Sequence, residues 1–139
     1  MDYRRYHDAW AVRLDPGEEI AACLADISRR EDIRTAAVVG LGAANEVEAG
    51  LFDTRTKGYR ANVWRGDMEI TSLTGSITRR EGEPYLHLHI TMCDEAGAVR
   101  GGHLSRAVVS ATAEIFLLPV AGEIGRRFDE GIGLNLCQF

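Results

Sequence analysis

The segment between Tyr85 and Cys93 constrains the fold most strongly, because its residues alternate between two chemical classes. Leucine, isoleucine and methionine occupy every second position, and the positions between them hold Tyr85, His87, His89, Thr91 and Cys93. Successive side chains of a β-strand point to opposite faces of its sheet. The pattern therefore predicts a strand with one face in the core and a less apolar face that carries both histidines.

Shorter alternating or apolar segments predict further strands at residues 6–14, 35–39, 46–53, 59–64, 68–73, 108–120 and 133–137. Turn-forming residues separate several of them, at residues 65–67, 80–84 and 94–97. We expect the second of these to close a hairpin. Gly40 and Gly42 predict a bend or a bulge, and residues 101–104, with the sequence Gly-Gly-His-Leu, predict a glycine-rich corner.

One helix is predicted after residue 14. Asp15 is a suitable cap, Pro16 suits the first helical position, and Glu18 stands where a capping-box carboxylate is found. Apolar residues then recur at the spacing of one helical face, and the helix is expected to end near residues 28–30.

The chain has 139 residues, of which 45% are hydrophobic, so it can bury a core without disulfide bonds. It has no internal repeat and no linker, and we treat residues 1–139 as a single domain. Many strands, tight turns and one clear helix predict an α+β fold, in which a mainly antiparallel β-sheet is flanked by one or two helices.

Charge and cysteine content narrow the function classes. Sixteen basic and twenty-one acidic residues give a net charge of −5, which disfavours binding to nucleic acid. The sequence shows neither a secretory signal nor an apolar stretch of the roughly 18–20 residues that a membrane helix needs. Its three cysteines are an odd number without a C-x-x-C pair. These features predict reduced thiols and a cytoplasmic protein without a membrane partner.

The pair His87 and His89, followed by His103, is the clearest candidate for chemistry. Residues two apart in a strand share a face and lie about 6.5–7 Å apart along the chain, so both imidazoles can converge on one ion. A third histidine would complete a site for zinc or another divalent metal, with one coordination position open for water or a ligand. The alternative is a pair of solvated or locally hydrogen-bonded histidines.

Glu114 is the second candidate, because it lies in the apolar run of residues 111–116. A carboxylate in such a run needs a partner or a raised pKa. Glu114 is therefore either half of a structural ion pair or a site residue. As a site residue it would be a catalytic general base, or an acceptor for the second ring nitrogen of a metal-bound histidine.

Several of these segments together resemble one family. Residues 73–77 (LTGSI), 84–90 (PYLHLHI), 101–104 (GGHL), 111–114 (ATAE) and 127–134 (RFDEGIGL) resemble the PPC domain, which is conserved in plants and prokaryotes. The likeness runs in order from about residue 10 to residue 136.

The resemblance implies a sheet flanked by a few helices and assembly as a homotrimer. In plants this domain follows AT-hook segments, but no Arg-Gly-Arg-Pro motif occurs in these 139 residues, so we do not expect the isolated domain to bind DNA. The fold is also similar to that of acetolactate decarboxylase, whose zinc is held by an H-x-H pair and a later histidine. His87, His89 and His103 match those ligands.

The resemblance thus favours a stand-alone, prokaryotic-type PPC protein that binds or acts on an unknown small molecule through a metal. The alternative is a DNA-associated regulatory module, or a protein-assembly module, without catalysis.

Overall fold

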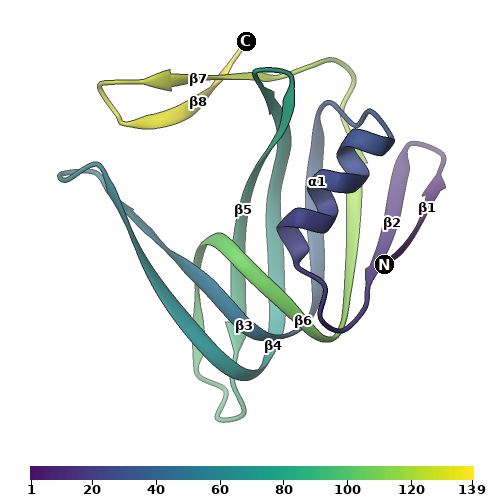
Figure 1. The fold of residues 1–139 in the computed structure, drawn as a ribbon, viewed down its shortest axis with the longest axis vertical. Helices are drawn as coiled ribbons and strands as arrows, with labels where there is room; N and C mark the ends of the chain where they lie inside the picture. Colours follow the sequence, from purple (N-terminus) through teal and green to yellow (C-terminus); the bar gives the residue numbers. More distant parts are fainter.

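The computed structural model describes residues 1–139 as eight strands and one helix (Figure 1). The helix is α1 (Ile20–Arg30), and the strands are β1 (Asp2–Tyr6), β2 (Ala9–Leu14), β3 (Ala36–Asp53), β4 (Gly58–Arg80), β5 (Glu83–Cys93), β6 (Val99–Pro119), β7 (Gly125–Asp129) and β8 (Leu134–Gln138). All strand pairs except β4–β7 are antiparallel. The predicted α+β class is confirmed, with a single helix.

Four long strands pair in a closed circuit. β3 pairs with β4 and β6, and β5 pairs with the same two strands, so that β3, β4, β5 and β6 have neighbours on both sides. The β1–β2 hairpin extends this sheet beside β6, and the β7–β8 hairpin is joined to it through a bridge between Arg79 and Gly125. Each strand of the circuit is therefore restrained by two ladders of backbone hydrogen bonds.

The core lies between α1 and the sheet that the helix covers in Figure 1. Leu24 and Ile27 of the helix and Leu88 and Ile90 of β5 belong to one cluster of 25 buried apolar residues. Because Leu88 and Ile90 face this core, the residues that alternate with them point to the other side of the sheet. The predicted division of β5 into a core face and a histidine face is confirmed.

The predicted start of α1 is wrong. The helix begins at Ile20, and its cap is Glu19, whose carboxylate accepts hydrogen bonds from the backbone of Ala21 and Ala22. The preceding backbone bonds to β6 instead, since the Gly17 amide donates to the Val109 carbonyl and Glu19 forms an isolated bridge with Val108. A tertiary contact thus occupies the residues from which the sequence predicts the first helical turn.

The turn predicted at residues 65–67 and the glycine-rich corner predicted at residues 101–104 are also wrong, because each lies inside a long strand. Residues 65–67 are part of β4, where β4 has one more residue than β3 between two paired positions and Gly66 has a φ of 111°. This is a bulge, which accepts a glycine with positive φ without ending the strand. Residues 101–104 are part of β6 and pair with β5.

Other turn predictions are confirmed. β4 and β5 form a hairpin closed by Glu81 and Gly82, which both have positive φ, as a tight two-residue turn requires. The register of β3 shifts between Gly40 and Gly42, where a bend or bulge is predicted. Two short strands were not predicted, β1 and β7, because both are polar and lack an apolar alternation.

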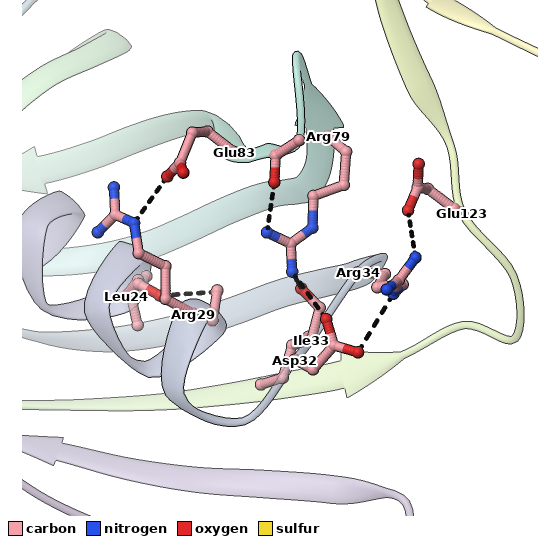
Figure 2. Close-up of polar contacts among 10 residues, drawn as sticks. Leu24, Arg29, Asp32, Ile33, Arg34, Arg79, Glu83 and Glu123 are labelled. Atoms are coloured by element: carbon pink, nitrogen blue, oxygen red, sulfur yellow. Dashed lines mark hydrogen bonds and ion pairs between the residues drawn. The ribbon is translucent and has the colours of Figure 1, made fainter.

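An arginine network joins the connection from α1 to β3 with the β4–β5 turn (Figure 2). Arg79 is 8% exposed and donates to the carbonyl oxygens of Ile33 and Gly82, at 3.2 and 3.4 Å. Asp32 lies 3.5 Å from the same guanidinium group. The buried charge of Arg79 therefore has both an anionic partner and carbonyl acceptors.

The helix α1 is not long and apolar enough to cross a membrane.

Candidate metal centre

The three candidate histidines lie together on two adjacent strands. His87 and His89 are on β5, His103 is on β6, and His89 and His103 are direct cross-strand partners. One ligand atom from each residue lies within 4.8 Å of those of the other two. The structure thus brings together the residues that the sequence singles out as metal ligands.

The spacing of the imidazoles fits a small ion. The Nε2 atoms of His87 and His89 are 3.3 Å apart. Two nitrogens bound about 2.05 Å from a tetrahedral zinc are also about 3.3 Å apart. The same distance suits a hydrogen bond between the two rings. The pair alone therefore does not distinguish a metal site from two histidines that bond to each other.

His103 provides the observation that favours a ligand. Its Nδ1 atom is buried and has no hydrogen-bond partner, which is unusual for a buried polar atom. Burial lowers the pKa of His103, and the nearby His87 and His89 lower it further. Burial, followed by the positive charge of Arg126, also lowers the pKa of His87. Neutral imidazoles carry the lone pair that a metal requires, so these residues fit a divalent ion.

Glycines allow the strands that carry the histidines to lie close together. A side chain at Gly101 would overlap the backbone of Ile90 on β5, and one at Gly102 would overlap the backbone of Gly50 on β3. On the other side of β5, a side chain at Gly75 would overlap the carbonyl oxygen of His87. Gly101 and Gly102 thus lie in a strand, and the absence of their side chains lets β6 approach β5 and β3 closely.

Aromatic and cationic side chains surround the histidines. The ring of Tyr59 lies 4.9 Å from that of His103 between centroids. Burial raises the pKa of Tyr59, with a smaller contribution from Tyr85. Arg126, on β7, lies over the ring of Tyr85. Tyr59 and Arg126 lie outside the motifs quoted from the sequence, and they reach the cluster only through the tertiary fold.

Glu114 is not brought to the histidines within one chain. It is exposed, it lies eleven residues beyond His103 on β6, and its cross-strand partners are Arg13 and Leu41. Its apolar sequence context does not bury the carboxylate, because the side chains of β6 alternate and Glu114 points away from the core. Its proposed catalytic role stays a prediction.

A family comparison agrees with these observations. The model of the Plants and Prokaryotes Conserved (PCC) domain matches residues 1–121. The chain belongs to the PCC family. This domain is the PPC domain that the sequence motifs resemble, and the match includes all three clustered histidines.

Solved PCC-type structures share the whole fold. A protein provisionally named as DNA-binding, from Bacteroides thetaiotaomicron, is 29% identical with a TM-score of 0.96, and the match covers 99% of this chain and 96% of that one. A metal-containing protein from Archaeoglobus fulgidus is 29% identical with a TM-score of 0.90, covering 100% and 99%. A PPC protein from Pyrococcus horikoshii is 31% identical with a TM-score of 0.88, covering 99% and 94%. No curated protein matches the chain at a significant level.

Proposed function

We propose that this PCC-domain protein holds a divalent metal ion, such as zinc, on His87, His89 and His103 and uses it to bind or act on a small molecule. The observation that carries the proposal is the convergence of three imidazoles within 4.8 Å, one of which has a buried nitrogen without a partner. The structural similarity to a metal-containing protein supports it.

Three nitrogen ligands leave one coordination position for water or a ligand atom. An ion held by the three histidines would polarise a carbonyl group or activate water at that open position. The chain itself contributes neutral imidazoles to the ion and two tyrosine rings and a guanidinium group to its surroundings.

Metal analysis of protein purified without a histidine tag tests the proposal. We expect about one ion per chain in the native protein and a loss of most of it in His89→Ala and His103→Ala. His7→Asn is the matched control, because His7 lies in the β1–β2 turn with a φ of 51°, which asparagine tolerates. Negligible metal in all four proteins, with no rise in melting temperature on adding zinc, would contradict the proposal.

We also propose that the protein is a homotrimer. An apolar patch on the outer face of β3 and β6 supports assembly, and it consists of Val39, Leu41, Phe116 and Leu118, which are 43–56% exposed. Val39 and Phe116 are cross-strand partners, and so are Leu41 and Glu114. A subunit that covered this patch would also cover Glu114. Because Glu114 lies far from the histidines of its own chain, only a neighbouring subunit could bring a histidine cluster near this carboxylate.

The second candidate function is a DNA-associated regulator, because two of the similar structures are provisionally named as DNA-binding proteins. The net charge of −5 argues against it. A gel shift at about 150 mM salt, where the screening length is ~8 Å, separates the candidates. Sub-micromolar binding of duplex DNA by the isolated chain would favour the regulator, and its absence together with bound metal would favour the small-molecule function.

A further inference from the structure

Side chains and backbone from three strands hold Arg126 in place. Its Nε donates to Thr78 Oγ1 and its Nη1 to the carbonyl oxygen of Asn135, both at 2.9 Å. Its Nη2 lies 3.5 Å from Ser76 Oγ, and the guanidinium carbon is 4.9 Å from the centre of the Tyr85 ring. These contacts from β4, β5 and β8 hold the guanidinium plane in one orientation.

The partners of Arg126 do not include a negative charge. Each acceptor that it contacts is a hydroxyl or a backbone carbonyl, although the side chain is half-buried. Arg79, which is also held by backbone carbonyl oxygens, has Asp32 at 3.5 Å. A partly buried cation without an anion is costly, and a bound anion would offset that cost.

The guanidinium group also lies beside the histidine cluster. Ser76 is the cross-strand partner of His87, and Tyr85 precedes His87 by two residues and so shares its face of β5. Arg126 Nη2 lies 3.5 Å from Ser76 Oγ, and directly opposite residues of paired strands share a face, so the guanidinium group is on the same side of the sheet as His87. One small molecule can therefore span the distance between Arg126 and the histidines.

The donors that remain on Arg126 indicate the class of anion. A guanidinium group has five N–H donors, and three of them have partners here. Two are left, which matches the two oxygens of a carboxylate. A second unused polar atom lies nearby, because Asn135 Oδ1 is buried without a partner while its Nδ2 donates to the Tyr85 hydroxyl. A hydroxyl group on the ligand would satisfy this acceptor.

From these contacts we propose that Arg126 binds the carboxylate of a small hydroxy- or oxo-carboxylic acid whose neighbouring oxygen reaches the ion on His87, His89 and His103. The part of this inference that concerns the ion rests on the proposed function. The part that concerns Arg126 and a carboxylate does not, and the two are tested separately.

Lactate is a suitable probe, with lactamide as the neutral analogue of the same shape. In calorimetric titrations of zinc-loaded protein, we expect native protein to bind lactate at least tenfold more tightly than lactamide. Arg126→Gln should weaken lactate binding tenfold or more and leave the zinc content unchanged. Arg127→Gln is the matched control, because Arg127 is the exposed neighbour on the same strand and should leave lactate binding unchanged.

Two further measurements keep the test valid if Arg126→Gln loosens the β7–β8 hairpin. Arg126→Lys keeps the charge but loses the forked donors, and it should bind lactate more weakly than native protein. In native protein, the NMR signal of the Arg126 Nε–H group should shift as lactate is added and not as lactamide is added.

Equal affinity for lactate and lactamide, or equal lactate affinity in Arg126→Gln and Arg127→Gln, would overturn the inference. Tighter binding of inorganic phosphate than of lactate would overturn the assignment to carboxylates. Lactate binding that depends on Arg126 in protein that takes up no metal would support the carboxylate site and contradict only the proposed function.

Discussion

Gly75 shows how little space separates the strands beneath the histidines. It is paired with Leu88, and a methyl group at this position would overlap the carbonyl oxygen of His87. We expect Gly75→Ala to lower the free energy of unfolding by about 2 kcal/mol or more, because backbone atoms must separate to admit the methyl group.

Urea denaturation monitored by circular dichroism measures this change. Gly58→Ala is the control, since the nearest atom to a methyl group there is 3.6 Å away and its φ is not in the left-handed region. Equal stability of the two variants would show that β4 and β5 are less tightly apposed than the structure indicates.

The lowered pKa values of His87 and His103 have a consequence for stability. Burial is the main cause of both shifts, so the folded chain binds fewer protons than the unfolded chain as the pH falls below the ordinary histidine value of 6.5. Unfolding then takes up protons, and the free energy of unfolding of metal-free protein should decrease from pH 7 to pH 5.

Denaturant titrations in the presence of a chelator would measure this dependence. A double variant, His87→Gln with His103→Gln, should show a shallower decrease over the same range. Keeping the pH at 5 or above avoids most of the titration of Asp15 and Glu18, whose pKa values are lowered by hydrogen bonds to the N-terminal amine. An identical slope in native and double-variant protein would contradict the assignment.

Among the elements, the β4–β5 turn and the connection from α1 to β3 are held together through Arg79 (Figure 2). Arg79→Ala leaves the Ile33 carbonyl without its donor and Asp32 without this partner. We expect it to lower the free energy of unfolding by about 2–3 kcal/mol.

Arg34→Ala is the matched control, because Arg34 is exposed and pairs with Asp32 and Glu123 at the surface. Exposed ion pairs contribute roughly 0–1 kcal/mol, so this variant should unfold close to the native midpoint. A loss from Arg79→Ala no larger than that from Arg34→Ala would show that the network is not structural.

The elements also show what a sequence can predict. The alternation in β5 depends on burial of one face, so its limits and the side on which His87 and His89 lie could be predicted. The start of α1 could not be predicted, because it depends on backbone bonds that Gly17 and Glu19 form with β6. Residues 65–67 have a sequence typical of a turn, and they form a bulge because β4 pairs with β3 on both sides of them.

The candidate site also contains residues that could be predicted from the sequence and residues that could not. The three histidines come from two segments with recognisable motifs, and their convergence could be predicted. Arg126 and Tyr59 could not be linked to them, since their positions depend on how the β3–β4 and β7–β8 hairpins fold back. These hairpins meet where Lys57 donates to the carbonyl oxygen of Glu130, 73 residues further along the chain.

For the whole molecule, the apolar patch on β3 and β6 predicts the effect of a charge placed in it. Phe116→Asp should reduce the mass in light scattering from about three times 15.3 kDa to a smaller species, because a carboxylate in a subunit interface would be desolvated. Val63→Asp is the control, as Val63 is similarly exposed on β4 and outside the patch. A monomer mass for native protein, or an unchanged mass for Phe116→Asp, would contradict the proposed role of the patch.

The position of β5 between β4 and β6 has a further consequence for the histidines. His89 is paired with Thr74 on one side and with His103 on the other, so its imidazole is attached to backbone that opens only if two ladders break. The amides around it should exchange with deuterium slowly, and at similar rates before and after metal is added. Uptake and release of an ion would then require only rotation of side chains on a fixed backbone, without folding of the site around the ion.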